Sequence, residues 1–270
     1  MMTICVPVPG EGELRLGAVS LPAGRLLRLE DGTGVGWITQ APVREPGPAW
    51  SALSALHGET GLIPVLVPTG RGDDLEASCY DPAEVADVDR ADAAAMLEHL
   101  WTDSLPGSWQ TGPEWGEENE HADEMTAPFS RQYPGLAPAV TRSLPAGPLE
   151  AVLRSFPASR VALVPAARPA DVLPVLNWCP GNWNCAFPAP SPAGFAAMLR
   201  SWEERFGARL LALTHDEAYL LVERPPYDLD SALPVAAEHF VFCDEPAGRQ
   251  SVQTTAAQII DAPVWHFWWD

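Results

Sequence analysis

Residues 191–222 read SPAGFAAMLRSWEERFGARLLALTHDEAYLLV, and the fold expected for the C-terminal part of the chain follows from this stretch. Ser191 followed by Pro192 is typical of a helix N-terminus, and Gly207 is typical of a helix end. Apolar side chains recur between them at helical spacing, so one helix face is expected to be buried. Two apolar segments then flank the short polar segment 214–217 and predict a β-hairpin. The apolar helix positions are Phe195, Met198, Leu199, Trp202 and Phe206.

The segments on either side of this stretch extend the pattern. Residues 161–164 form an expected strand before it, and a helix at about 231–242 and a last strand at 264–269 follow it. The order β-α-β-β-α-β permits a two-layer α/β sandwich of the ferredoxin-like or a related kind. We therefore expect an α+β protein in which this sandwich packs against a smaller N-terminal α+β half.

The N-terminal half shows weaker signals of the same type. Residues 26–29 and 35–38 flank a Gly-rich turn and predict a hairpin, and apolar residues at helical spacing follow Trp50. Residues 62–67 read as a strand. Pro64 lies inside this strand and lacks an N–H donor, so we expect the strand to lie at an edge or to contain a bulge.

Composition divides the chain into three parts: an N-terminal half at 1–102, a Pro/Gly-rich acidic segment at 103–150 and a C-terminal domain at 151–270. Residues 114–124 carry six of the acids. This run is either a solvated linker, or a long surface excursion that binds a partner. The second alternative stays open because tryptophans border or lie in the segment. They are Trp101, Trp109 and Trp115.

The charge balance excludes several function classes. The chain has 36 acids, 16 bases and a formal net charge of −20, and every base is Arg. Without Lys there is no P-loop or Schiff-base lysine, and the acidity argues against a nucleic-acid partner. Neither a secretory leader nor an 18-residue apolar run is seen, and the five cysteines are scattered, so we expect a cytoplasmic protein that does not bind membranes. Arg without Lys is typical of a GC-rich bacterial genome.

Five motifs occur in order along the C-terminal domain. They are NWxxGxxN at 177–184, SWEERFGA at 201–208, RPP at 224–226, AEHF at 237–240 and WHFWWD at 265–270. Over about residues 160–270 the sequence resembles a bacterial domain-of-unknown-function family, number 4253, with a weaker similarity at 50–67. This resemblance implies membership of the family and implies no catalytic residue, cofactor or partner.

Glu238 and His239 are the candidate catalytic residues. Neighbouring helical residues point about 100° apart, so the two do not form a dyad with each other. Their helix is apolar on two sides, which predicts cover on both sides and partial burial of Glu238. A buried carboxylate needs a cationic partner, and Arg205 and Arg224 are the nearest candidates by motif. Glu238 is therefore either half of a structural ion pair or a site residue.

Cysteines provide a weak alternative in the form of a zinc site. His239 and Cys243 share a helix face, and Cys179 and Cys185 could complete a Cys₃His set. The five residues between Cys179 and Cys185 exceed the usual two to four, so buried apolar thiols are favoured. A Cys243–His239 nucleophile pair is disfavoured by its apolar surroundings. We expect no metal and no cofactor.

The loop motif at 177–184 allows two interpretations. Asn177 and Asn184 either bond to their own backbone, or line a polar pocket that has Trp178 in its aromatic wall.

The terminal strand is apolar on both faces, which predicts a strand buried between the helices and the N-terminal half. The alternative is an exposed aromatic patch around Trp268 that binds a partner. We expect an ordered strand, with Arg205 or Arg224 near Asp270.

Three functional hypotheses follow. The first is a non-catalytic acidic binding protein, of the immunity or inhibitor type, with a basic protein as partner. The second is a small-molecule enzyme with a pocket built from Asn177, Asn184, Arg205 and Glu238. In that pocket Glu238 would be the acid or base, and Arg205 or Arg224 would bind an anion. The third is a self-assembling scaffold with the aromatic terminus at a symmetric interface, so a homo-oligomer stays open.

Overall fold

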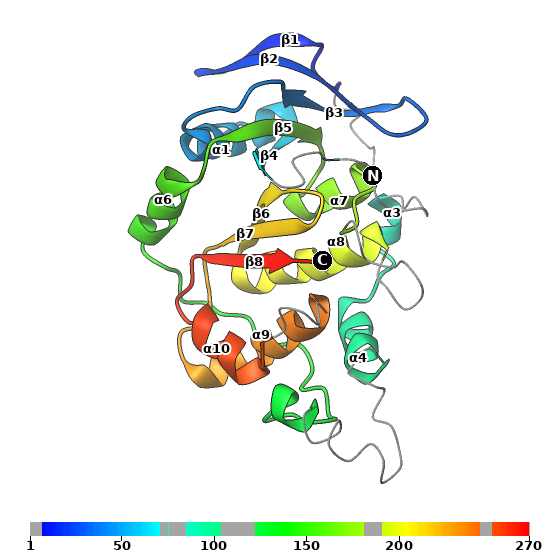
Figure 1. The fold of residues 1–270 in the computed structure, drawn as a ribbon, viewed down its shortest axis with the longest axis vertical. Helices are drawn as coiled ribbons and strands as arrows, with labels where there is room; N and C mark the ends of the chain where they lie inside the picture. The colour runs from blue at the N-terminus through cyan, green and yellow to red at the C-terminus, as the bar shows by residue number, and fades with distance from the viewer. Residues whose placement is uncertain are drawn as a thin grey trace.

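The computed structural model describes residues 7–70, 75, 85–103, 122–180, 191–243 and 250–269. These form a mixed α+β fold around one eight-stranded, mostly antiparallel sheet (Figure 1). In space the strands follow the order β1-β2-β3-β5-β4-β6-β7-β8. Their bounds are β1 Gly12–Leu16, β2 Val19–Arg28, β3 Gly34–Thr39, β4 Leu62–Pro68, β5 Ser159–Pro165, β6 Ala208–Leu213, β7 Glu217–Val222 and β8 Val264–Trp268.

Helices cover both faces of the sheet, so its central strands lie in the middle of three layers rather than in the expected two (Figure 1). On one face, helices α1 (Pro46–Ala55) and α6 (Ala146–Ser155) pack over a core around Trp37 and Leu163. The larger group of helices packs on the opposite face. It consists of α4 Ala93–Asp103, α7 Val172–Val175, α8 Pro192–Phe206, α9 Leu229–Phe242 and α10 Val252–Ile259.

Further short elements are α2 (His57–Thr60), α3 (Val85–Val88), the 3₁₀ turn η3 (Pro169–Asp171) and a helical turn at 122–126. Within the described ranges, no helix is both long and apolar enough to cross a membrane.

Helix α8 has the bounds that its sequence predicted. The Ser191 hydroxyl accepts a hydrogen bond from the Gly194 N–H at 3.2 Å and caps the helix. Gly207 ends it with φ +61, in the left-handed region that favours glycine. All five predicted apolar positions are buried, which at about 1.5–3 kcal/mol for each side chain makes this face a main source of stability.

Helices α1 and α6 approach each other closely at Gly47. A Cβ placed on Gly47 would overlap the backbone carbonyl of Leu153 in α6. Only a residue without a side chain fits at this crossing, and the contact fixes α6 over the sheet.

The spatial order of the strands differs from the ferredoxin-like arrangement that the element order permits. Strand β5 pairs with β3, with Trp37 opposite Leu163, and with β4 along its whole length. The N-terminal strand β4 therefore lies between β5 and β6, so the N-terminal strands belong to the same sheet instead of packing against it. Strand order of this kind depends on pairing between distant segments, which the local pattern does not specify.

Strand β4 is central, so its expected position at an edge is wrong. Pro64 lies opposite Leu163 of β5 within an unbroken register. On the other side, the parallel ladder between β4 and β6 is registered only at Leu66 with Ala212. Pro64 is tolerated because the ladder to β6 does not extend to its position.

Strand β8 is ordered and antiparallel to β7, as expected, but it lies at the edge of the sheet and not between layers. Trp265 and Phe267 are buried against α8 and α9, whereas His266 and Trp268 are exposed. The expectation of burial on both faces is therefore wrong for this strand. Its outward face corresponds to the alternative of an exposed aromatic patch.

The described end of the 103–150 segment packs on the helices. Trp101 of α4 contacts Phe129 and Tyr133 through its ring, and it is fully buried. The Val140 N–H donates to the carbonyl of Arg205 at the end of α8. Most of the acidic run at 114–124, with Trp109 and Trp115, lies outside the described residues.

Candidate functional site

Glu238 and Arg205 form a bidentate ion pair between α9 and α8. Nη1 of Arg205 lies 2.7 Å from Oε1 of Glu238, and Nη2 lies 2.7 Å from Oε2. The Trp202 indole N–H also donates to Oε2 at 2.6 Å, and the Ala137 N–H donates to Oε1 at 2.7 Å. Each carboxylate oxygen therefore accepts two hydrogen bonds in a fully buried environment. Of the two predicted interpretations of Glu238, this geometry is that of a structural ion pair.

His239 lies next to this pair, inside a cage of aromatic rings. The centroid of its ring is 4.5 Å from that of Trp265, 4.9 Å from Phe267 and 5.0 Å from Trp202. Burial lowers the pKa of His239 to about 3, and the positive charge of Arg205 contributes in the same direction. The imidazole is therefore neutral at physiological pH, and it does not act there as a proton donor of the imidazolium type.

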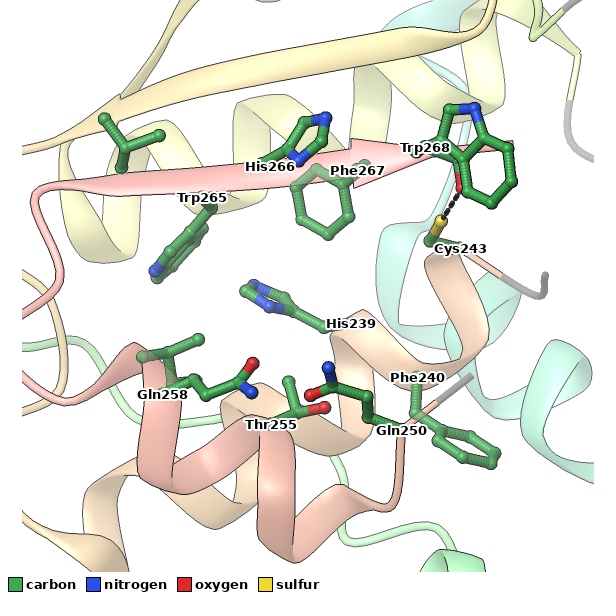
Figure 2. Close-up of a pocket in the computed structure, with 12 residues that line it drawn as sticks. His239, Phe240, Cys243, Gln250, Thr255, Gln258, Trp265, His266, Phe267 and Trp268 are labelled. Carbon is green, nitrogen blue, oxygen red and sulfur yellow. Dashed lines mark hydrogen bonds between the residues drawn. The ribbon is translucent and has the colours of Figure 1, made fainter. Parts of the chain in front are cut away.

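A pocket of about 520 Å³ opens between β8, α9 and α10 (Figure 2). In the figure the rings of His239 and Trp265 project into the space between β8 and the two helices. Exposed glutamine side chains form part of its mouth, and aromatic rings form its floor. Its described lining contains no Asp, Glu or Arg. The polar lining residues are His239, Cys243, Gln250, Thr255, Gln258 and His266.

The outer edge of β8 borders this pocket. In an antiparallel pair, alternate residues direct their backbone groups toward the neighbouring strand. The Trp269 N–H donates to the carbonyl of Asp216 at 2.9 Å. The backbone N–H and C=O groups of Trp269 and of every second residue before it therefore point toward β7. Val264 and His266 therefore direct their N–H and C=O groups away from β7, and no hydrogen bond from a described residue reaches them.

The opposite, exposed side of β7 and β8 is termed the open face here, and it consists of Glu217, Tyr219, His266 and Trp268. His266 stacks on Tyr219 at 4.2 Å between ring centroids, and its Nε2 lies 3.2 Å from Oε1 of Glu217. Burial and then the charge of Glu217 raise the pKa of Tyr219 to about 12. Trp268 is 36% exposed beside them. A second pocket, of about 390 Å³, adjoins the open face and is also lined by Asp216.

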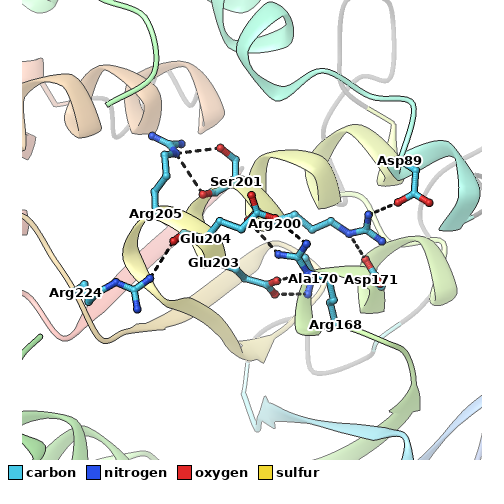
Figure 3. A network of polar contacts seen from close by, with 10 residues as sticks. All are labelled: Asp89, Arg168, Ala170, Asp171, Arg200, Ser201, Glu203, Glu204, Arg205 and Arg224. Atoms are coloured by element: carbon cyan, nitrogen blue, oxygen red, sulfur yellow. Dashed lines mark hydrogen bonds and ion pairs between the residues drawn. The ribbon is translucent and has the colours of Figure 1, made fainter. Parts of the chain in front are cut away.

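A second ionic network lies on the other side of α8 (Figure 3). Arg168 bonds to Glu203 through Nε at 2.9 Å, and Glu203 also accepts from the Ala170 N–H at 2.8 Å. Burial raises the pKa of Glu203, and the Ala170 N–H and Arg168 oppose this shift. Nε of Arg200 donates to Oδ1 of the buried Asp171 at 2.6 Å. The network therefore attaches η3 to α8.

The other predicted binding residues that the structure describes are dispersed over the fold. Trp178 is buried in the core, and its indole N–H donates to the Thr214 carbonyl at 2.7 Å. Asn177 adopts φ +50 at the end of α7. Arg224 donates to the Glu204 carbonyl at 3.0 Å and so satisfies the C-terminus of α8. Asn177, Arg205, Glu238 and Arg224 line neither described pocket. Asn184 and Asp270 lie outside the described residues, so the expected arginine contact with Asp270 is untested.

Two of the three cysteines of the weak zinc alternative lie in the described part of the chain. Cys179 is buried, and the Cys243 thiol donates to the Trp268 carbonyl at 2.9 Å. Cys185 lies outside the described residues. Within the described part of the chain, no group of three His, Cys, Asp or Glu side chains is placed to hold a metal ion.

Two features of the site were missed by sequence reasoning. The apolar pattern places Trp202 on the core face of α8, and its bond to Glu238 was not foreseen because the two residues come from different helices. Gln258 and Thr255 line the pocket from α10, a helix that the sequence pattern did not predict. The N-cap Ser251, whose hydroxyl accepts from the Thr254 N–H, is the signal that could have indicated α10.

Comparison with known proteins gives one result. The family described as Domain of unknown function (DUF4253) matches residues 160–270. No curated protein and no solved structure matches the chain. The match begins in β5, and it includes α8, α9, the pocket and the open face. The resemblance read from the five motifs is thus confirmed, because the model of the DUF4253 family matches the part of the chain from β5 to its last residue.

Proposed function

We propose that this protein is a non-catalytic binding protein, of the immunity or inhibitor type, that binds a basic protein through the open face. The observation that carries the proposal is the exposure of Trp268 and His266 beside the carboxylates of Asp216 and Glu217. An aromatic ring next to carboxylates is a suitable site for Arg or Lys, because it combines cation–π attraction with ion pairing.

The carboxylates at the second pocket keep acceptor capacity for such a partner. Thr214 donates to Oδ1 of Asp216, and Tyr219 donates to Oε1 of Glu217. No described residue donates to the second oxygen of either carboxylate. The net charge of −20 would in addition accelerate the approach of a cationic protein.

The surroundings of the two candidate catalytic residues favour binding over catalysis. Glu238 already accepts four hydrogen bonds, so it has no lone pair to offer a substrate proton. His239 has a pKa of about 3, which is far from the value that suits a general base at neutral pH. The scattered cysteines suit the reducing cytoplasm, which we propose as the compartment.

The test is affinity capture from the cells in which the protein occurs, followed by reconstitution with the purified partner. We expect a cationic protein whose dissociation constant rises with ionic strength. Trp268→Ala should weaken binding at least about tenfold, as loss of a central aromatic anchor does. Tyr227→Ala is the matched control, because Tyr227 is an exposed aromatic residue elsewhere, at 48% exposure. Equal binding by both variants would refute the open face as the interface.

The unpaired outer edge of β8 favours a second candidate, which is self-assembly. A row of unpaired backbone groups can pair with the same strand of another copy. Sedimentation over a range of concentrations tests this candidate. A monomer at all concentrations would exclude it.

A further inference from the structure

His239 and Trp265 line the pocket between β8, α9 and α10, and each has one buried nitrogen without a described hydrogen-bond partner. His239 is 7% exposed and Trp265 is 2% exposed, and both line the pocket. Neither Nε2 of His239 nor Nε1 of Trp265 has a hydrogen-bond partner among the described residues. Leaving a buried polar group unpaired destabilises the folded state, and such groups in native proteins require an explanation. A phenylalanine in place of His239 would fit the same aromatic cage without this cost.

The pocket also restricts the charge of any ligand. Its described lining has no acidic or basic side chain, apart from His239, which is neutral, and the exposed His266. An ion that entered would lose water without gaining a counter-charge, which is unfavourable. The polar groups that remain are two amides, a hydroxyl, a thiol, two imidazoles and the backbone of β8.

The backbone geometry of β8 indicates which hydrogen-bonding groups the ligand should carry. His266 directs both its N–H and its C=O away from β7, toward the outer edge that borders the pocket. A donor and an acceptor on one residue match a flat group that carries an acceptor beside a donor. The aromatic rings of Trp265 and Phe267 offer flat surfaces for such a group.

We propose that this pocket binds a small, neutral, planar ligand of the amide type, in which a carbonyl oxygen lies beside an N–H group. Nε2 of His239 and Nε1 of Trp265 bond the ligand at the buried end, and the outer edge of β8 and the glutamine side chains bond it at the mouth. The pocket meets the open face at His266 and Trp268, which line both. The two nitrogens of the proposed site belong to His239 and Trp265, which lie on the other side of β8, so this inference does not depend on the proposed protein partner.

The test uses three probes of equal size and different charge: benzamide, benzoate and benzylamine. The protein is labelled with ¹⁵N-histidine, and the six imidazoles report binding separately. We expect benzamide to shift the His239 ring signals with saturation, and its dissociation constant should be at least tenfold lower than those of the two ions. Equal affinity for all three probes would overturn the proposal. It would also be overturned if the His239 signals stayed unchanged at high benzamide concentration, because the pocket would then hold only water.

Two variants provide the control. His239→Phe keeps an aromatic ring in the cage and removes the nitrogen, so the benzamide dissociation constant should rise about tenfold. His215→Phe makes the same exchange at a residue that lines neither described pocket, and benzamide affinity should stay the same. Unaltered affinity in His239→Phe would also overturn the proposal. If that variant fails to fold, the shift of the wild-type His239 signals decides.

Discussion

Arg205 and Glu238 bind each other through two parallel contacts of 2.7 Å, and this pair connects α8 to α9 beside the Ala137 backbone. The Arg205 guanidinium also donates to the Ala137 carbonyl at 2.9 Å. Three segments that are distant in sequence therefore meet at one carboxylate. Breaking a buried pair of this kind leaves the remaining charge without compensation.

Replacing Glu238 by alanine should lower the free energy of unfolding by about 3–5 kcal/mol. The loss arises because the Arg205 guanidinium and the Trp202 indole lose their acceptor inside the protein. Glu204→Ala is the matched control, because Glu204 also binds an arginine, Arg168, but its side chain is 66% exposed. Exposed pairs contribute about 0–1 kcal/mol. Urea denaturation measures both variants, and similar losses would contradict the structural role of Glu238.

The free energy of unfolding should fall in mild acid because the pKa of His239 is low in the folded protein. Its pKa in the folded protein is about 3, below the ordinary value of 6.5, so the unfolded chain binds the proton first. The contribution to stability is fully present above pH 6.5 and is lost as the pH falls toward 3. The slope between about pH 6 and 4 should be about 1.4 kcal/mol per pH unit.

Denaturation of the wild type and of His239→Phe over this pH range isolates the effect, because carboxylates contribute equally to both proteins. The difference in unfolding free energy between the two should change with pH as described. A difference independent of pH would show that the pKa of His239 is the same in the folded and the unfolded state.

The two tryptophans at the end of β8 should behave in opposite ways. Trp269 is 2% exposed, and its ring packs against Trp178 and Phe242, so Trp269→Ala should destabilise the protein by about 3–5 kcal/mol. Trp268 is 36% exposed, so Trp268→Ala should change stability by about 0.5 kcal/mol or less. Thermal melting compares the variants, and a lower midpoint for Trp268→Ala than for Trp269→Ala would contradict the assigned faces.

Two glycines offer a similar contrast. Gly47→Ala places a methyl group against the Leu153 carbonyl and should force α1 away from α6, so we expect a marked drop in the melting temperature. A methyl group on Gly58 would meet no atom within 4 Å, and Gly58 lies in the helical turn α2. Gly58→Ala should therefore be neutral or stabilising by about 0.4–1 kcal/mol. Thermal melting compares the two variants. A melting temperature of Gly47→Ala equal to or above that of Gly58→Ala would contradict the close contact between α1 and α6.

Local signals explain which parts of the fold could be predicted. The bounds of helix α8 follow from the sequence because Ser191, Gly207 and the apolar face act within one segment. The partner of Glu238 was among two candidates, Arg205 and Arg224, because a buried carboxylate requires a cation. These inferences depend on the chemistry of neighbouring residues and not on the order of strands.

Features that depend on distant pairing could not be predicted. Pro64 indicated an edge strand, yet β4 is central, because the short ladder to β6 leaves room for proline. The aromatic residues of β8 indicated burial on both faces, whereas no described helix covers His266 and Trp268. The pocket combines α9, α10 and β8, and only the packing of those elements brings His239 and Gln258 together.

The position of β5 has a consequence for how the chain matures during synthesis. β5 opens the segment that the DUF4253 family matches, yet both of its neighbours, β3 and β4, come from outside that segment. On the ribosome, β3 and β4 emerge long before the strand that joins them, and their unpaired edges are exposed until residue 165 has been made. The segment matched at 160–270 is therefore smaller than the sheet that it helps to form, because it contains neither neighbour of β5. A protein made of this segment alone would leave both edges of β5 without a partner strand, so it would need two strands from another source to fold stably.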